Sequence, residues 1–395
     1  MRLKRFKEKI RLANKFFIKA PKKWHLPRKC DIVLYDNCGA ENLIPYLTNY
    51  SFEILATEGE WLNVPCMLIA LCRIYQFDGS LTQAYNDTFI RAAAPVVVMT
   101  FIDNNPEFYL LSNRHSDVKT IFIQNGLRAD RSPLFATCKS NKDYHVDYMC
   151  VFGRAIGRLY GQYITGAILP IGSLKNNAIK VEAKLNKNSI LFISQYRPCT
   201  DQNSPMFALK DGSSVSYGNF FAAERAVLKF LYKWCSANNK MLSVAGSCSE
   251  EDESAERAFY MENLPDGEWT YVPKTSIFSS YHLADASEIV VFIDSTLGYE
   301  AFARGKKVAA FSCRGFQIAG LAASFGWLTE LPTTGLFWTK ELDEIHFQRI
   351  MDYLNVTSDQ DWDIARQRMY PEEIINFDPG NSQLVALLKT ILVKH

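Results

Sequence analysis

Short apolar runs alternate with segments of helical periodicity along most of this sequence, a pattern typical of parallel α/β structure. The runs are continuous more than strictly alternating, which is typical of strands buried on both faces of a sheet. In the first half of the chain they predict strands at 31–36, 52–56, 95–102, 119–124 and 146–152, helices at 42–49 and 64–75, and a further apolar run at 167–173.

The pattern breaks once and then restarts, which predicts two consecutive domains of similar size. Residues 174–188 are polar and rich in Lys and Asn, as expected of a linker. Beyond them the sequence predicts strands at 189–194, 241–245, 269–272, 288–293 and 307–311 and helices at 219–237, 276–284 and 298–304. We expect α/β domains at 30–175 and 188–360 and a helical segment at 361–395. Ligands of such sheets bind beyond the carboxyl ends of the strands, so a cleft between two facing sheets is the expected site.

The first 29 residues differ in charge from the rest of the chain. They contain twelve Lys or Arg residues and one Glu, whereas the remainder is mildly acidic. Apolar side chains recur on one helical stripe of this segment, at Leu3, Phe6, Ile10, Ala13 and Phe17. Such a helix fits an anionic membrane surface, with packing on the protein's own acidic body as the alternative. We expect residues 1–29 to hold the protein at the inner face of the cytoplasmic membrane, and the acidic body argues against a nucleic-acid partner.

Composition narrows the class of protein further. With 395 residues, 48% of them hydrophobic, the chain has enough apolar material for two sizeable cores. Ten Cys residues do not make a disulfide framework at this length, and no C-x-x-C pair or other spacing suggests a metal site. No uninterrupted apolar stretch fits a secretory signal or a membrane span. The sequence therefore favours a globular cytoplasmic protein without a bound metal.

The strongest chemical signal lies where a buried strand ends in Asp294-Ser295-Thr296, followed by a turn with Gly298 and a short helix. A helix N-terminus offers N–H groups and partial positive charge, and the two hydroxyl groups add donors. We expect Gly298 to let an anion approach the backbone and Glu300 to bind ribose hydroxyls, so the segment fits a nucleotide. Ordinary helix capping by Ser or Thr is the alternative.

The run from Glu288 to Val308 resembles the donor-binding domain of GT-B glycosyltransferases, most closely the capsule and surface-polysaccharide proteins that handle Kdo and related acidic sugars. It is also similar to the UDP-N-acetylglucosamine 2-epimerase fold. Short stretches at 57–63, 122–126 and 153–173 resemble motifs of the same families. The resemblance implies two Rossmann-like α/β domains that face a central cleft. It also implies that the Ser/Thr–Gly turn holds the donor phosphates and the helix Glu holds the ribose.

Three more residues of the second domain are candidates for the donor site. Ser194 and Arg197 follow the first strand of this domain, and the Arg197 guanidinium can clamp a phosphate or a sugar carboxylate. His282 precedes the strand of the phosphate turn and can stack on a base or contact a phosphate. The alternatives are a surface loop for Arg197 and a structural role for His282.

The first domain offers candidates for the acceptor side. Three side chains after one of its strands are expected to face the cleft: Gln124, Asn125 and Arg128. Asn125 stands where the capsule transferases often have His, so a His general base is not expected at this turn. Glu58 and Glu60 form a carboxylate pair at another strand end, and Glu60 is the better candidate to activate the acceptor. Asp36 or Glu41 could play the same part.

These observations predict a metal-independent GT-B glycosyltransferase of surface polysaccharide biosynthesis, of capsule or lipopolysaccharide type. The donor would be a nucleotide sugar, CMP-Kdo-like or a UDP-sugar, and the acceptor a surface glycan or a lipid-linked glycan. No cofactor is expected besides this donor substrate. Two alternatives stay open: an epimerase or hydrolase of nucleotide sugars with the same fold, and a non-catalytic polysaccharide-assembly protein that docks through its basic arm.

Overall fold

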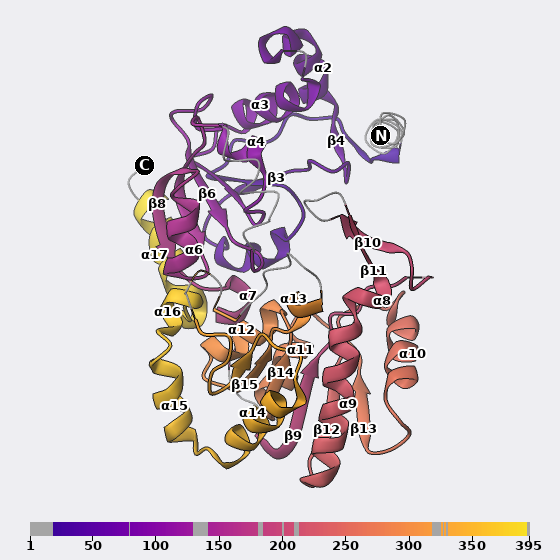
Figure 1. The fold of residues 1–395 in the computed structure, drawn as a ribbon. Coiled ribbons are helices and arrows are strands. Elements are labelled where there is room, and N and C mark those ends of the chain that lie inside the picture. Colours follow the sequence, from indigo (N-terminus) through magenta and orange to yellow (C-terminus); the bar gives the residue numbers. More distant parts are fainter. Residues whose placement is uncertain are drawn as a thin grey trace.

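The computed structural model consists of two α/β domains, one above the other in Figure 1. It describes residues 19–78, 80–128, 141–180, 185–199, 201–208, 213–317, 325–326, 328 and 331–392. The amphipathic helix predicted from Leu3 to Phe17 lies outside the described residues.

The first domain is built on a six-stranded parallel sheet. Its strands, in spatial order, are β3 (Phe52–Leu55), β2 (Ile32–Tyr35), β5 (Val97–Thr100), β6 (Lys119–Ile123), β7 (His145–Val151) and β8 (Thr165–Pro170). Every residue of β2 and β5 is buried, as the continuous apolar runs predicted for strands covered on both faces.

The second domain repeats this plan with a second parallel sheet. Its strands, in spatial order, are β13 (Trp269–Val272), β12 (Met241–Ala245), β9 (Asn186–Ile193), β14 (Ser287–Phe292), β15 (Lys307–Phe311) and β16 (Trp338–Thr339). The chain therefore starts this sheet in its middle, at β9, builds outward to β13, and then returns to the other side of β9 with β14.

Helices cover both sheets. In the first domain these are α2 (Val64–Arg73), α3 (Leu81–Ala93), α4 (Pro106–Tyr109), α6 (Arg154–Tyr160) and α7 (Leu174–Asn177). In the second they are α8 (Tyr217–Phe220), α9 (Ala222–Ala237), α10 (Glu253–Asn263), α11 (Ser279–Ala286), α12 (Thr296–Ala303), α13 (Arg314–Gln317), α14 (Glu344–Val356) and α15 (Asp359–Gln367). Among the described residues, no helix is both long and apolar enough to cross a bilayer.

The C-terminal segment leaves the second domain and returns to the first. After α15 it forms α16 (Pro371–Ile374), the 3-10 turn η5 (Pro379–Asn381) and α17 (Ser382–Leu392), which run along one side of both domains in Figure 1. Buried side chains of α17 belong to the same apolar cluster as β2 and β5 of the first sheet. The helical character of 361–395 agrees with the sequence, but its attachment to the first domain was not predicted.

Three local expectations differ from the structure. Residues 42–49 form no α-helix, because the chain makes two 3-10 turns, η2 (Ala40–Asn42) and η3 (Ile44–Tyr46), with Pro45 unable to donate a backbone hydrogen bond. The linker expected at 174–188 contains α7 and the start of β9. The helix expected at 219–237 is divided at Phe221 into α8 and α9.

Five further elements are short, four of them strands and one a 3-10 turn. The strand β1 (Lys22–Lys23) pairs in parallel with β4 (Leu62–Asn63), which immediately precedes α2. A small antiparallel ribbon, β10 (Pro205–Ala208) with β11 (Ser214–Ser216), extends from the second domain. The basic segment at 19–29 is thereby fixed beside α2, and the 3-10 turn η4 (Ile74–Phe77) continues that helix.

Candidate functional site

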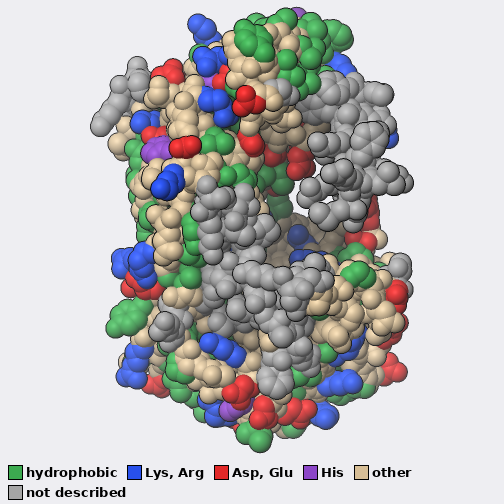
Figure 2. Space-filling view, turned by 45° about the horizontal axis from the view of Figure 1, so that its top comes forward, with side chains coloured by type: hydrophobic (Ala, Val, Ile, Leu, Met, Phe, Trp, Pro, Cys, Tyr) green, Lys and Arg blue, Asp and Glu red, His purple; other side chains and the backbone are tan. Residues whose placement is uncertain are grey.

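A cleft of about 380 Å³ lies between the two domains. The space-filling view shows a hollow between the two halves of the molecule, with Lys or Arg atoms visible inside it (Figure 2). The second domain lines the cleft with Ile193, Ser194, Ala245, Gly246, Ser247, Lys274, Ile277, Ser280, Tyr281, Ser295, Thr296, Leu297 and Glu300, and the first with Glu41, Asn125 and Lys175. Ser194, Gly246 and Ser247 come directly after β9 and β12, and Ser295 and Thr296 follow β14, so the carboxyl edge of the second sheet forms one wall.

The position of the cleft follows from the order of the strands. In the second sheet the chain order reverses between β9 and β14, which are neighbours although β12 and β13 separate them in the sequence. Loops after two such strands diverge to opposite faces and leave a crevice, which is where doubly wound sheets bind ligands. Ser194 follows β9, and Ser295 and Thr296 follow β14, so all three reach this crevice.

The N-terminus of α12 opens into this cleft. Ser295 is its N-cap residue, yet its side chain makes no capping hydrogen bond. The hydroxyl of Thr296 accepts a 3.3 Å hydrogen bond from the backbone N–H of Leu127 in the first domain. The partial positive charge of the helix terminus and the Ser295 hydroxyl are therefore available to an anion.

Glu300 lies one turn further along α12 and joins the two domains. Its buried carboxylate accepts a hydrogen bond from the hydroxyl of Ser173, which follows the first sheet. Burial raises the pKa of Glu300, and hydrogen bonds from Ser173 and Tyr281 act in the opposite direction. The carboxylate is thus held at the cleft wall with hydroxyl donors around it, a setting suited to exchange for the hydroxyl groups of a sugar.

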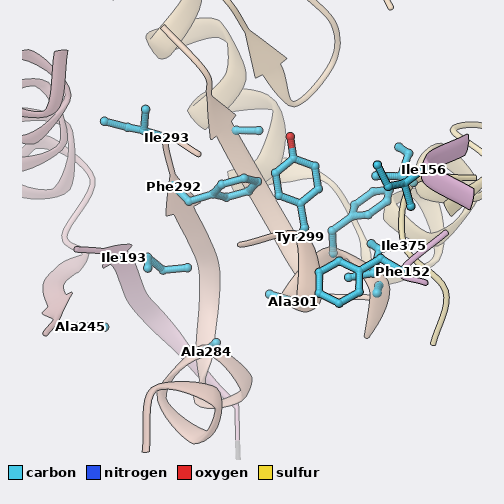
Figure 3. Packing of buried hydrophobic residues seen from close by; sticks show 14 of the residues in the cluster. Phe152, Ile156, Ile193, Ala245, Ala284, Phe292, Ile293, Tyr299, Ala301 and Ile375 are labelled. Carbon is cyan, nitrogen blue, oxygen red and sulfur yellow. The ribbon is translucent and has the colours of Figure 1, made fainter. Parts of the chain in front are cut away.

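Gly298 is required by packing, which corrects the role expected for it. It is buried and does not line the cleft. A Cβ atom placed on it would lie 2.1 Å from Cγ of Phe292, the last residue of β14. Figure 3 shows the Phe292 and Tyr299 rings close together, and their centroids are 5.4 Å apart. The glycine lets α12 approach its own strand and does not open the backbone to a ligand.

Ser194 lines the cleft but is also part of a buried polar network. Its hydroxyl donates to the carboxylate of Glu256 and accepts a 2.6 Å hydrogen bond from the Tyr260 hydroxyl. Glu256 is fully buried and also accepts from the backbone N–H of Ser247, at 2.9 Å, and of Cys248, at 3.0 Å. This network fixes the loops after β9 and β12, which form the floor of the cleft.

The first-domain turn at 124–128 sends one of its three predicted side chains to the cleft. Asn125 lines it, whereas Gln124 is buried and bridges the backbone, accepting from the Phe152 N–H at 2.8 Å and donating to the Gly126 carbonyl at 2.8 Å. Arg128 is paired with the buried carboxylate of Asp103, with Nε 2.8 Å from Oδ2. Gln124 and Arg128 therefore hold the backbone of the turn in place and do not face a ligand in the cleft.

Three more predicted site residues do not line the cleft. Arg197 is exposed, because the chain turns outward after the buried residue Tyr196, and its guanidinium donates to the Tyr196 carbonyl, 3.4 Å away. His282 is exposed on α11, where the preceding residue Tyr281 faces the cleft instead. Glu60 follows the edge strand β3, away from the reversal point of the sheet, and accepts from the N–H of Glu58 at 3.2 Å.

Two lysines of the cleft were missed by the sequence analysis. Lys175 lies on α7, within the segment interpreted as a linker, and enters the cleft from the first domain. Lys274 follows β13 and enters from the second. Lys175 lies in the first turn of a short helix and Lys274 in a loop after a strand, and a single Lys in either place carries no pattern that distinguishes it from a solvated surface residue. The carboxylate that lines the first-domain side of the cleft belongs to Glu41, which was the alternative to Glu60 in the sequence analysis.

Metal chemistry has no evident site within the described residues, where no group of three or more His, Cys, Asp or Glu side chains is placed to hold an ion. Among the residues that the structure describes, the charged groups that line the cleft are Glu41, Lys175, Lys274 and Glu300. Positive charge facing a ligand in the cleft therefore comes from the two lysines and the terminus of α12.

Comparison with known proteins identifies the family and the fold. A family described as "putative O-antigen biosynthesis protein" matches residues 121–392. Two solved structures are similar over nearly their whole length. They are S. aureus MnaA with UDP (TM-score 0.52, 11% identity, 92% of this chain and 97% of that one) and the Methanocaldococcus jannaschii UDP-GlcNAc 2-epimerase in complex with UDP-GlcNAc and UDP (TM-score 0.52, 10% identity, 91% and 99%). The wall teichoic acid polymerase TagF is also similar (0.50, 11%, 92% and 89%).

At these identities the likeness shows the fold alone, and it confirms the predicted GT-B-like architecture of two Rossmann-like domains facing a cleft. No curated protein sequence matches the chain. The family and the fold together confirm the resemblance to surface-polysaccharide biosynthesis proteins.

Proposed function

The chain belongs to the O-antigen biosynthesis family that matches residues 121–392, and from this premise we propose that it is a glycosyltransferase. It transfers a sugar from a nucleotide-sugar donor to a surface glycan or a lipid-linked acceptor. The observation that carries the proposal is the cleft at the reversal point of the second sheet, which is lined by the N-terminus of α12 and by Lys175 of the opposite domain.

The donor phosphates lie in this proposal between α12 and the first domain. The Ser295 hydroxyl and the positive end of α12 meet them from one side and the Lys175 ammonium from the other. Glu300 holds the ribose by exchanging its bond to Ser173 for a ribose hydroxyl. Charge that develops on the leaving nucleotide is stabilised by these groups without a metal ion, because they are fixed before the reaction begins.

The acceptor side is assigned to the first domain. Glu41 replaces Glu60 as the proposed group that takes the proton of the acceptor hydroxyl, because its carboxylate lines the cleft and that of Glu60 does not. Asn125 lines the same wall and orients the acceptor or the transferred sugar. A general base contributes typically 10²–10⁴-fold to the rate, so Glu41→Gln is expected to lower kcat by about two to four powers of ten.

Two donor classes stay in the proposal. Similar structures contain UDP and UDP-GlcNAc, which favours testing UDP-sugars first. The resemblance of the 288–308 segment to proteins that handle acidic sugars favours a CMP-linked sugar acid. The basic arm at 1–29 is proposed to hold the enzyme at the inner face of the cytoplasmic membrane, where lipid-linked acceptors are found; most of that arm lies outside the described residues.

The test is binding of nucleotides to the purified protein, measured by thermal shift and then by calorimetry with UDP, CMP, GDP, ADP and their sugar conjugates. A ligand at 100 times its Kd stabilises the native state by about 2.7 kcal/mol. The Ser295→Ala and Lys175→Gln variants are each expected to weaken the affinity for the preferred nucleotide about fivefold to tenfold, as for one lost hydrogen bond or charge contact.

Ser358→Ala is the matched control for Ser295→Ala. The Ser358 side chain caps α15 by accepting from the Asp361 N–H, far from the cleft, so its loss lowers stability by about 1 kcal/mol and leaves affinity unchanged. Ser295 makes no such bond, so Ser295→Ala is expected to fold with nearly wild-type stability. Wild-type affinity in both cleft variants would refute the donor site, and no binding of any nucleotide would favour the non-catalytic assembly protein.

An epimerase is the second candidate, because one of the similar structures is a UDP-GlcNAc 2-epimerase that matches over nearly its whole length. Glu41 and Glu300 place carboxylates on the two walls of the cleft, as an enzyme that moves protons on a bound sugar requires. Incubation with UDP-GlcNAc alone, followed by NMR, separates the two functions: an epimerase changes the sugar without an acceptor, and a transferase leaves it unchanged.

A further inference from the structure

One face of α2 is apolar and exposed to solvent. Leu68, Ile69 and Leu71 project from it, with Leu68 60% exposed, and Tyr75 of η4 is 75% exposed. The opposite face is buried in the first-domain core with Cys66, Met67 and Ala70. Figure 2 shows hydrophobic side chains gathered over the end of the molecule where Figure 1 labels α2. A surface helix of a globular protein normally carries polar residues on its outer face, so this apolar face indicates a site that binds an apolar partner.

The surroundings of this face carry positive charge and few negative groups. Residues 61–77 contain no Asp or Glu. The β1–β4 pair holds the basic N-terminal segment next to the start of α2, and the His25 carbonyl accepts a 2.8 Å hydrogen bond from Asn63, the N-cap residue of α2. Lys23 is exposed over the Trp61 ring, 4.1 Å from its centroid, and Trp24 beside it is 68% exposed.

We propose that the exposed face of α2, formed by Leu68, Ile69, Leu71 and Tyr75, inserts into the interfacial region of an anionic lipid bilayer. Apolar and aromatic side chains next to Lys and Arg are the combination that binds such a surface, because the chains enter the acyl boundary while the cations meet the headgroups. The described part of the basic segment, residues 19–29, contains five basic residues and no acidic one, enters the fold beside this helix and adds attraction to the same surface.

A second copy of the chain fits this face less well. Stable protein interfaces bury roughly 1,200–2,000 Å² in total, and four side chains on one short helix supply only a small part of that area. Two copies meeting at α2 would also bring their basic segments together, which electrostatic repulsion opposes. The inference does not depend on the donor site, because it uses only residues outside the cleft.

The experiment measures co-sedimentation of the full chain with vesicles of phosphatidylglycerol and phosphatidylcholine, at low and at high salt. Leu68→Glu/Leu71→Glu is expected to lower the partition coefficient by about tenfold or more. Two apolar side chains that would enter the bilayer are lost, and two negative charges face the anionic lipid instead. The loss should persist at high salt, where attraction of the basic arm is screened.

The matched control is Ile345→Glu/Val356→Glu on α14 of the second domain, which makes the same kind of change at side chains that are 75% and 81% exposed. It should bind vesicles like the wild type. The single variant Tyr75→Glu gives a second test should the double variant fold poorly, and unchanged nucleotide binding shows that the cleft is intact. Wild-type partitioning of both α2 variants would overturn the inference, as would a lipid-independent dimer that the same substitutions dissociate.

Discussion

Asp103 is the residue on which the first-domain wall of the cleft depends. Its buried carboxylate accepts from the Asn125 backbone N–H at 3.2 Å, pairs with Arg128, and accepts from the hydroxyl of Tyr160. These bonds join the loop after β5 to the turn after β6 and to α6. The side chain of Asn125 reaches the cleft because its backbone is held here.

Replacing Asp103 with Asn is expected to destabilise the protein by about 3–5 kcal/mol, since it leaves the guanidinium of Arg128 without a carboxylate partner in a site that is mostly shielded from water. Urea denaturation measures the loss. Glu373→Gln is the control, because it removes a carboxylate whose partner Arg158 is exposed, and it should cost less than about 1 kcal/mol. Similar small losses in both variants would contradict the structural role of Asp103.

At the scale of elements, an ion-pair cluster fixes α2 against α3. The carboxylate of Asp87 on α3 is fully buried and lies 3.1 Å from Arg73 of α2, 2.9 Å from Arg91 and 2.8 Å from His115. Burial by itself raises the pKa of Asp87, but the side chains of His115 and Arg91 outweigh it and lower the pKa to about 2. The helix that carries the exposed apolar face is thereby anchored in a fixed orientation.

This cluster predicts a loss of stability in acid. The pKa of Asp87 is lowered from 3.8 in the reference state to about 2, so its contribution is complete above the unfolded pKa and disappears as the pH falls through the folded one. The difference in the free energy of unfolding between the wild type and Asp87→Asn should therefore fall by about 2 kcal/mol between about pH 5 and pH 2. Urea titrations of both proteins across this range measure the difference, and a constant difference would contradict the assignment.

At the scale of the whole molecule, the returning C-terminal segment ties the two domains together. Leu384, Leu388 and Ile391 of α17 are buried in the apolar cluster of the first sheet, although their chain leaves from the second domain. Figure 3 shows Ile375 beside Phe152 and Ile156 of the first domain. Together with the Ser173–Glu300 bond across the cleft, this limits how far the domains can separate.

Truncating one of these side chains should therefore destabilise the first domain. Leu384→Ala is expected to cost about 2–5 kcal/mol, because it opens a cavity in a fully buried site. Lys389→Ala, on the exposed side of the same helix, should stay within about 0.5 kcal/mol of the wild type. Chemical denaturation of both variants checks this, and equal effects would mean that α17 does not pack on the sheet in solution.

The sequence alone was enough for the features that depend on neighbours along the chain. Continuous apolar runs located most strands of the two large sheets within a few residues, because a strand buried on both faces must be apolar throughout. The edge strand β16 was not predicted. The position of Ser295 and Thr296 directly after such a strand was enough to place them at the cleft, since parallel strands end at the same edge of a sheet.

Only the tertiary structure decided which side chains meet across the cleft and which glycine serves packing. Lys175 lines the same cleft as Ser295 because α7 follows the first sheet at that wall, and no pattern around Lys175 encodes this placement. Gly298 and Arg197 were assigned to the ligand from their sequence neighbours. In the structure the ring of Phe292 packs against Gly298, and the chain turns outward at Arg197, so neither residue lines the cleft. Contacts between residues that are remote in sequence depend on how two domains pack, and local periodicity carries no information about that packing.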